Sequence, residues 1–329
     1  TGAGYCRPCK PMNPSMTHLL LQLALFVVAL GNSSLLLAQI RPTVAVWHPT
    51  ANAVMTGSQS GLQEYSWPQL KLQRQLECNI EHILDLRLAA DQQRLLVAGG
   101  TAGETGILQL LDLHSGKTLL TCTPHSDRIT QTCWLPGDKQ ILTASDDGTA
   151  TVLNAQDGTV QRRITLHSRP LLALTYSGDL QAATAGMDGI IRLWQPQDGR
   201  LIRILDNHTG PVTSLLAPRT ELATTPLLYS ASRDKTIRLW QPLRGRLVRF
   251  ARLNAVPQAL HLTQNRSQLL VGCTDGTLQQ LQPESLELLR TSQLEHGSIN
   301  TLLQHPASGD LLICADQGLL LFSADQLQP

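Results

Sequence analysis

A repeat of 41 to 46 residues runs along this chain and restricts its fold more than any other feature. In each unit an apolar strand ends in a turn of small residues and an alternating strand follows, most plainly in residues 184–194 (TAGMDGIIRLW) and 230–240 (SASRDKTIRLW). A period of this length means that one supersecondary unit is stacked on copies of itself. The residues at the turn position are Ser60, Thr105, Asp147, Asp188, Asp234, Asp275 and Asp316.

Seven units with short turns predict a closed all-β fold. Hydrophobic residues make up 42% of the chain and aromatic residues only 4%, which suits many short strands whose cores consist of Leu, Val, Ile and Ala. A closed β architecture can use all 329 residues as one unit. We therefore expect a seven-bladed β-propeller of four-stranded antiparallel blades. A second turn with Gly follows the alternating strand, as antiparallel neighbours require, at Gly116, Gly158, Gly199 and Gly245.

With these repeats the chain resembles the WD-repeat β-propeller family, from about residue 35 to the C-terminus. In that family a His in the loop entering the blade, a Ser or Thr of the second strand, the turn Asp and the Trp of the third strand form a hydrogen-bonded line. The resemblance implies three such structural sets: His125, Thr143 and Asp147; His167, Thr184, Asp188 and Trp194; His208, Ser230, Asp234 and Trp240.

The other units depart from the family pattern. If the first or last unit is not a blade, the ring has six blades, but the even spacing favours seven. At the Asp and Trp places we expect Ser60 and Ser66 in the first unit, Thr105 and Leu111 in the second, Leu153 at the Trp place of the third, Asp275 and Leu281 in the sixth, and Asp316 and Phe322, with His296, in the last.

The hydrogen-bonded sets have a structural and a catalytic interpretation. A buried Asp that accepts from a His ring satisfies polar groups that would otherwise be costly inside a sheet. The alternative is a catalytic dyad of His208 and Asp234. We prefer the structural interpretation and expect no catalytic, cofactor-binding or metal-binding residues.

An apolar run from Leu19 to Leu30, broken only by Gln22, is the second informative feature. It has the length of a signal-peptide core and is too short to span a bilayer. Three interpretations remain: export with cleavage, an uncleaved membrane anchor, and a cytoplasmic protein whose start is misread. We expect residues 1–15 to form an upstream or disordered segment, 16–31 the signal peptide or anchor, and 32–329 the propeller.

The cleavage point is tied to ring closure. Members of the family close the ring by lending an N-terminal strand to the last blade, which leaves no open sheet edge. The strand available here is residues 35–40. Cleavage after Ala38 would remove most of it, whereas cleavage after Gly31 would keep it, so we expect the mature chain to begin near Asn32.

Cysteines and other motifs add no site. Cys6 and Cys9 form a CxxC, but no second pair lies at a zinc-site distance. The Gly-rich stretch 99–106 lacks the Lys of a phosphate loop, so we expect a long turn there. We expect free buried thiols at Cys78, Cys122, Cys133, Cys273 and Cys314.

A net charge of +1 hides a basic segment. Between Arg192 and Arg252 there are eleven Lys or Arg and four Asp or Glu, a balance of +7. The segment is either a patch that faces an anionic partner or a set of solvated positions that protects sheet edges from pairing. No aromatic stacking residues are interleaved there at regular spacing, so nucleic-acid binding is not expected. The candidate contacts are Arg200, Arg203, Arg238, Arg244, Arg246, Arg249 and Arg252.

Two function classes follow from this architecture. The preferred one is a non-enzymatic platform for a protein or peptide partner, with the contact sector on the Arg-rich fourth and fifth blades. The alternative is a propeller that binds a small ligand, or acts as an enzyme, at the mouth of its central channel. That alternative needs carboxylates or histidines that converge there, and a membrane would be contacted only through an uncleaved N-terminus.

Overall fold

The computed structural model describes residues 41–177, 181–218 and 226–323. The chain divides into two units, Thr1–Ser34 and Leu35–Pro329, and all described residues belong to the second. The predicted signal segment, Cys6, Cys9 and the predicted closing strand at residues 35–40 therefore lie outside the described residues.

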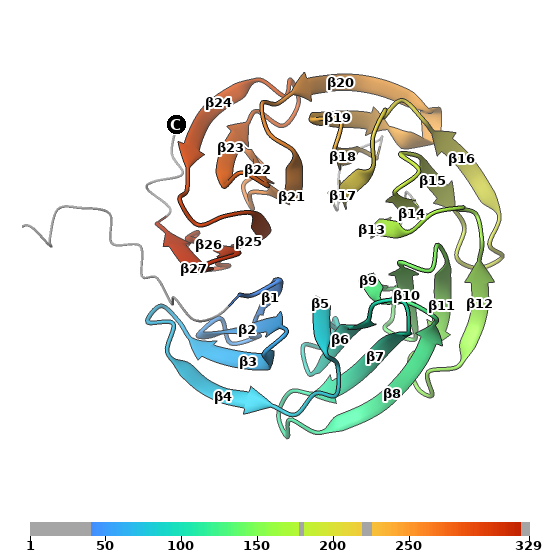
Figure 1. The fold of residues 1–329 in the computed structure, drawn as a ribbon, viewed down its shortest axis with the longest axis vertical. Helices are drawn as coiled ribbons and strands as arrows, with labels where there is room; N and C mark the ends of the chain where they lie inside the picture. The colour runs from blue at the N-terminus through green and yellow to red at the C-terminus, as the bar shows by residue number, and fades with distance from the viewer. Residues whose placement is uncertain (1–40, 178–180, 219–225, 324–329) are drawn as a thin grey trace, which may run out of the picture. The chain divides into compact units, whose positions relative to one another are not determined.

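Seven antiparallel sheets form the propeller unit, so the prediction of seven blades is confirmed (Figure 1). Blade one holds β1 (Val44–Trp47), β2 (Ala53–Ser58), β3 (Gly61–Ser66) and β4 (Leu72–Leu76). Blade two holds β5 (His82–Leu88), β6 (Arg94–Thr101), β7 (Thr105–Asp112) and β8 (Thr118–His125). Blade three holds β9 (Ile129–Trp134), β10 (Gln140–Ser145), β11 (Ala150–Asn154) and β12 (Val160–Ile164).

The remaining four blades repeat this order. Blade four holds β13 (Leu171–Ser177), β14 (Gln181–Gly186), β15 (Ile191–Trp194) and β16 (Leu201–Leu205). Blade five holds β17 (Val212–Leu216), β18 (Leu228–Ser232), β19 (Thr236–Gln241) and β20 (Arg246–Arg252), with the short helix η1 (Pro242–Arg244) before β20. Blade six holds β21 (Pro257–Leu262), β22 (Leu269–Cys273), β23 (Thr277–Leu281) and β24 (Leu288–Gln293). Blade seven shows three described strands, β25 (Ile299–Gln304), β26 (Leu311–Ala315) and β27 (Gly318–Phe322).

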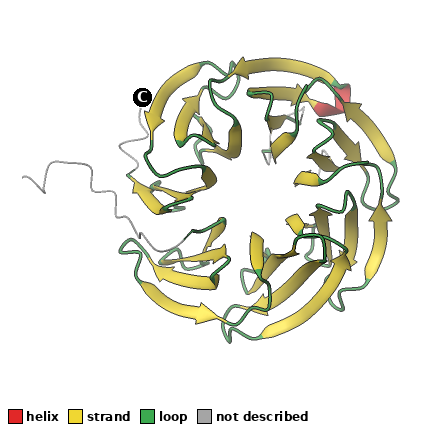
Figure 2. Ribbon diagram, viewed as in Figure 1, coloured by secondary structure: helices red, strands yellow, loops and turns green. Residues whose placement is uncertain are grey.

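Each blade places its first strand at the centre of the ring and its last strand at the rim, and strands make up nearly all of the regular structure (Figure 2). The second strands of blades one, five, six and seven are buried at every position because neighbouring blades cover both of their faces. The rim strands are largely exposed. The large exposed apolar side chains of the described residues all lie on or beside these rim strands, at Leu72, Leu119, Val160, Leu201, Ile204, Leu243, Phe250, Leu288 and Leu289.

A β-bulge recurs at the same place on the inner strands of blades two to seven. Side chains of one blade then reach the backbone of the next. Asp85 accepts from the backbone N–H and the hydroxyl of Thr132, both at 2.7 Å, and Gln131 accepts from the backbone N–H of Leu174 at 2.6 Å. These bonds tie neighbouring inner strands together without a continuous sheet.

Blades one and seven join the two ends of the ring. The Trp47 indole donates to the carbonyl of Gln304 at 2.9 Å, and the Thr301 hydroxyl donates to the carbonyl of Thr43 at 3.1 Å. Behind these bonds lies an apolar cluster to which both blades contribute, formed by Ala45, Val54, Tyr65, Leu70, Leu312, Cys314 and Leu319.

Two details of the repeat alignment were wrong. In blade one the residue at the Trp place is Tyr65, paired with Val54 and 2% exposed, and not Ser66. The reason is a hairpin turn shorter than that of blade three, which shifts the following strand by one residue. In blade two Thr105 begins β7 opposite Thr101, so it lies on a strand and not in the turn.

Candidate functional site

The hydrogen-bonded set of blade five links four elements. His208 lies in the loop before β17, Ser230 on β18, Asp234 in the turn after β18, and Trp240 on β19. His208 Nδ1 lies 2.8 Å from Asp234 Oδ2, and His208 Nε2 lies 2.7 Å from Ser230 Oγ. The Trp240 indole donates to the same Ser230 oxygen at 2.8 Å. Since the carboxylate can only accept, Nδ1 donates to Asp234 and the Ser230 hydroxyl donates to Nε2.

Blade four contains the same arrangement. His167 lies 3.0 Å from Asp188 through Nδ1 and 2.9 Å from Thr184 through Nε2. The Trp194 indole donates to the Thr184 hydroxyl at 3.1 Å. Arg192, whose side chain is 13% exposed, also donates to the Asp188 carboxylate.

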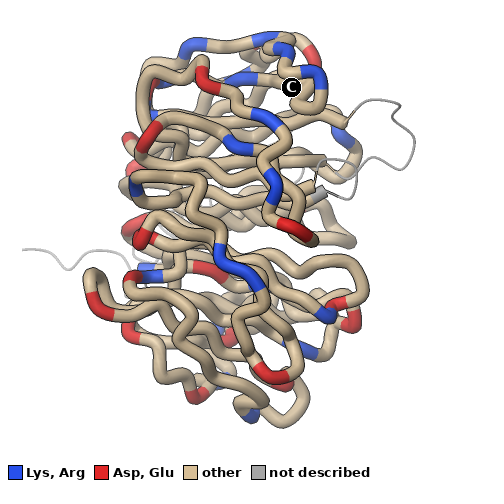
Figure 3. The backbone as a smooth tube through the Cα atoms, turned by 90° about the vertical axis from the view of Figure 1, so that its right-hand side faces the viewer, with Lys and Arg blue, Asp and Glu red and all other residues tan. Residues whose placement is uncertain are grey.

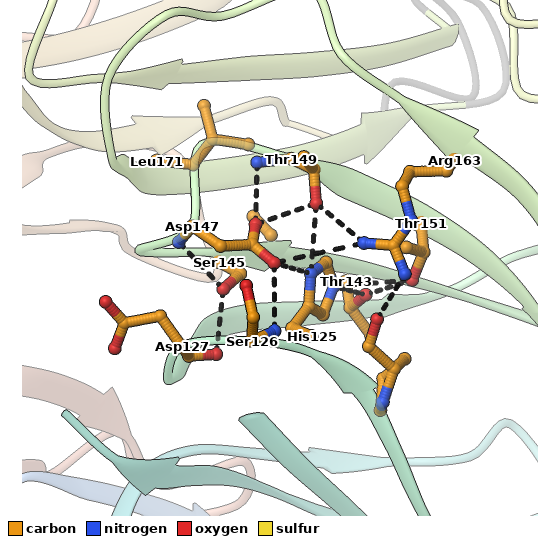
Figure 4. Close-up of polar contacts among 12 residues, drawn as sticks. His125, Ser126, Asp127, Thr143, Ser145, Asp147, Thr149, Thr151, Arg163 and Leu171 are labelled. Carbon is orange, nitrogen blue, oxygen red and sulfur yellow. Dashed lines mark hydrogen bonds and ion pairs between the residues drawn. The ribbon is translucent and has the colours of Figure 1, made fainter. Parts of the chain in front are cut away.

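Blade three builds the set without Trp (Figure 4). His125 lies 2.9 Å from Asp147 and 2.7 Å from Thr143. Leu153 occupies the Trp place and offers no donor, but the Thr151 hydroxyl on β11 lies 2.6 Å from that of Thr143. A second hydroxyl therefore takes the position of the missing indole N–H.

The carboxylates of these sets are held in the ionised form. Burial alone would raise their pKa values, but the hydrogen bonds that they accept from His, Thr, Arg or backbone donors outweigh it and lower the pKa to about 2 at Asp188 and at Asp234. The pKa of Asp147 is also lowered, with burial opposed by His125 and Thr149. Burial lowers the pKa of His208 despite the nearby Asp234 carboxylate, which keeps its ring neutral.

These shifts predict a loss of stability in acid. Asp188 and Asp234 have folded-state pKa values of about 2, below the ordinary 3.8, so their contribution is present above pH 3.8 and is lost as the pH falls through 2. Burial lowers the pKa of His261 from 6.5 to about 4, so protonation of the unfolded chain removes stability between those two values. We expect the calorimetric melting midpoint to fall in both windows.

Two variants separate the windows. Asp234→Asn should reduce the pH dependence between pH 2 and 3.8, where Asp188 still contributes, and His261→Gln should reduce it between pH 4 and 6.5. A midpoint that is independent of pH from 7 to 4 in the wild-type chain would contradict the assignment of His261.

The Ser230, His208 and Asp234 contacts follow the order of a catalytic triad, but their position rules out that role. The side chain of His208 is not exposed, and Ser230 is fully buried. The Ser230 oxygen already bonds to both Trp240 and His208. A nucleophile must reach a substrate carbonyl, so this set holds the blade together.

The remaining blades lack the complete set. In blade seven Asp316 accepts from the Ser298 backbone at 3.1 Å and from the Asn300 side chain at 3.0 Å. Nδ1 of His296 is buried without a partner among the described residues, so Asp316 and His296 do not pair. In blade six Asp275 accepts from the backbone of Thr277 at 3.0 Å.

The seven candidate contact arginines do not form a single surface. Arg238 lies on β19 with its side chain 13% exposed and 3.9 Å from Asp234, so it belongs to the structural set of blade five. Arg200 is exposed but lies near Asp198, at 3.8 Å. Lys and Arg segments lie along the rim strands in the side view (Figure 3). The other five candidates are exposed on β16, on η1 and on β20: Arg203, Arg244, Arg246, Arg249 and Arg252.

Some rim arginines connect neighbouring blades, which the sequence interpretation missed. Arg162 on β12 donates to the carbonyl of Gln197 in blade four at 3.0 Å. Arg203 on β16 packs against Gly245 of blade five, where a Cβ would lie 2.9 Å from its guanidinium and φ is +67°. The signal in the sequence was an Arg at the same place of most rim strands: Arg74, Arg162, Arg203, Arg249 and Arg290.

The inner strands do not bring acidic groups together. The bulged residues are Leu84, Thr130, Leu172, Thr213, Gln258 and Asn300. The third residue beyond the bulge is Arg87 in blade two and His261 in blade six, with Cys, Thr or Leu in the other bulged blades. Within residues 41–177, 181–218 and 226–323, no three His, Cys, Asp or Glu side chains are grouped so that they could hold a metal ion.

No disulfide joins the cysteines of the described ranges, as expected, but only two of the five are buried. Cys273 and Cys314 are buried, whereas Cys78, Cys122 and Cys133 are partly exposed. Burial raises the pKa of Cys122 to about 11 and that of Cys273 to about 12, so these thiols are unreactive near neutral pH. The part of the chain that the structure describes contains no helix with the length and apolar character needed to cross a membrane.

Comparison with known proteins agrees with this geometry. The family described as "WD domain, G-beta repeat" matches residues 116–153, 158–195 and 199–241. Each match begins at or just before a rim strand and ends on or beside the third strand of the next blade. The three matched repeats are those with the His, Thr or Ser, and Asp contacts. The chain is a WD-repeat β-propeller.

Other comparisons give the fold alone. The crystal structure of the computationally designed Ika8 protein aligns with a TM-score of 0.67 and 19% identity, over 86% of this chain and 83% of that one. A search of curated proteins found no significant match. The architecture of this WD-repeat propeller is therefore established.

Proposed function

We propose that this WD-repeat propeller is a non-enzymatic platform for protein–protein interaction, a scaffold subunit whose contact sector includes the rim of blades four and five. The observation that supports the proposal is that the buried His and Asp side chains bond to one another and hold the blades together. The His and Asp side chains of blades three, four and five bond to each other and to neighbouring hydroxyls, while charged and apolar side chains are exposed on the rim. A rigid ring with a varied outer surface suits recognition.

The small-ligand alternative receives less support. It needs convergent carboxylates or histidines at the inner strands, and the bulged positions there are Leu, Thr, Gln and Asn. Arg87 is an exposed charged residue of an inner strand. Its side chain is 47% exposed, and its Nε donates to Asp85 at 3.2 Å. One guanidinium can hold an anion but supplies no acid–base pair.

For localisation we propose export, with a mature chain that begins near Asn32. This proposal rests on the apolar run of residues 19–30 and on the need to keep residues 35–40 for ring closure. An N-terminal peptide that begins at Gln39 would contradict it, and recovery in the membrane fraction with the run intact would favour an anchor.

Affinity purification of the full chain from its own source tests the platform proposal. Soluble and membrane fractions are kept apart, and co-purifying proteins and the mature N-terminus are read by mass spectrometry. We expect a stoichiometric protein partner that is lost when Arg244, Arg246 and Arg249 are replaced by Glu. A chain recovered alone from both fractions would count against a platform and favour a ligand-binding propeller.

A further inference from the structure

The rim strand of blade five has an open edge. Among the described strands, β20 pairs with β19 and with no other. The backbone N–H of Leu253 donates to the carbonyl of Lys235 at 2.8 Å, so Arg252 and Phe250, one and three residues before it, form the pairs with β19 that exchange no backbone hydrogen bonds. Their N–H and C=O groups point away from the blade, where another strand can pair with them.

The edge of β20 carries positive charges that no nearby carboxylate neutralises among the described residues. From Lys235 to Thr274 the chain contains seven Lys or Arg and no Asp or Glu. Within the described ranges, no carboxylate forms an ion pair with the four exposed arginines of η1 and β20, whereas Arg200 on the neighbouring blade has Asp198. The four are Arg244, Arg246, Arg249 and Arg252.

The same edge also exposes large apolar side chains. Phe250 is 60% exposed, the highest fraction among the large apolar side chains of the described residues. Leu243 of η1, just before the start of β20, is 39% exposed. An exposed aromatic ring between arginines adds apolar contact to the paired backbone and the charges.

We propose that the edge of β20 binds an extended, acidic segment of a partner protein, which adds to blade five as a further strand. The backbone groups of Phe250 and Arg252 pair with the segment, Arg246 and Arg249 on one face of β20 bind its carboxylates, and an apolar side chain on the other face covers Phe250. The proposal rests on the platform function and names its partner's chemistry. A second copy of this strand is a poor occupant, because edge-to-edge pairing would place arginines opposite arginines.

The test uses the full chain and a short fluorescein-labelled peptide of alternating Glu and Val, with a Lys–Val peptide for comparison. We expect saturable binding of the Glu–Val peptide by fluorescence anisotropy, and about tenfold weaker binding by Arg246→Glu/Arg249→Glu. Hydrogen exchange should show new protection at the amides of Phe250 and Arg252.

A proline variant tests strand pairing separately from charge. Phe250→Pro removes an N–H that points outward and leaves the ladder with β19 intact, so we expect weaker binding at an unchanged melting midpoint. The matched control is Ile204→Pro on β16, which is paired with Arg192 as Phe250 is paired with Arg238. If Phe250→Pro unfolds the blade, Phe250→Ala and the exchange measurement replace it.

Several outcomes would overturn the proposal. These are equal binding of the Lys–Val peptide, no binding of either peptide, and binding without protection at Phe250 and Arg252. The two proposals fail separately. A natural partner that Phe250→Pro still binds would retain the platform and remove this site, whereas a chain without any natural partner would remove the platform.

Discussion

Trp240→Ala is expected to lower the free energy of unfolding by about 3 to 5 kcal/mol, the usual cost of truncating a large buried aromatic side chain. Trp240 is fully buried between blades four and five, in a cluster that includes Leu193, Leu205 and Leu228. Its removal leaves a cavity at a blade interface and also takes the indole donor from Ser230. Equilibrium denaturation in urea measures the change.

The control for the cavity is Trp240→Phe. It keeps most of the volume and loses the bond to Ser230, so we expect a loss of about 1 kcal/mol. Blade three shows that a Leu is tolerated at this place when a second hydroxyl is present, as at Leu153 and Thr151. Equal losses for the Ala and Phe variants would mean that the hydrogen bond, and not the packing, dominates.

Asp234→Ala is expected to lower stability by about 1.5 to 3 kcal/mol, the contribution of hydrogen bonds to a charged group. The carboxylate accepts from the His208 ring at 2.8 Å and from the Thr236 hydroxyl at 2.6 Å. Both donors lose their partner, and the His208 side chain has no exposed surface from which to reach water. Peptide binding at the β20 edge, once normalised to folded protein, should not change.

Asp275→Ala in blade six is the matched control, because Asp275 occupies the same turn and no His of the described residues bonds to it. It accepts from the backbone of Thr277 at 3.0 Å. We expect a loss of less than about 1 kcal/mol there. An unchanged melting midpoint for Asp234→Ala would contradict the structural role of the His–Asp pair.

The sequence predicted the parts of the fold that depend on residue type at fixed spacing. A buried His, a hydroxyl and a carboxylate occur at fixed spacings in the sequence. The contacts of His167 and His208 therefore agree with the hydrogen-bonded set that the family resemblance implied. The sequence did not reveal that the Thr151 hydroxyl replaces the missing indole N–H in blade three, because Thr151 contacts Thr143 only across two paired strands. Likewise, the place of Tyr65 depends on the length of one turn.

The rim was harder to predict. An arginine on a rim strand can face solvent, a neighbouring blade or a partner, and these choices depend on which turn lies beside it. Arg162 meets the carbonyl of Gln197, while no carboxylate pairs with Arg249 among the described residues. Arg238 was grouped with the rim arginines by sequence proximity, but its strand lies inside the blade, beside Asp234.

The joint between blades one and seven has a consequence for biosynthesis. The hydrogen bond between Trp47 and Gln304 links residues 257 positions apart, so it cannot form until the last blade has been translated. Until then Ala45 and Val54 lack the apolar cover that Leu312 and Leu319 provide. The ribosome-bound chain therefore exposes apolar surface on blade one, where it can aggregate. We expect a chaperone that covers blade one during elongation to increase the yield of closed rings.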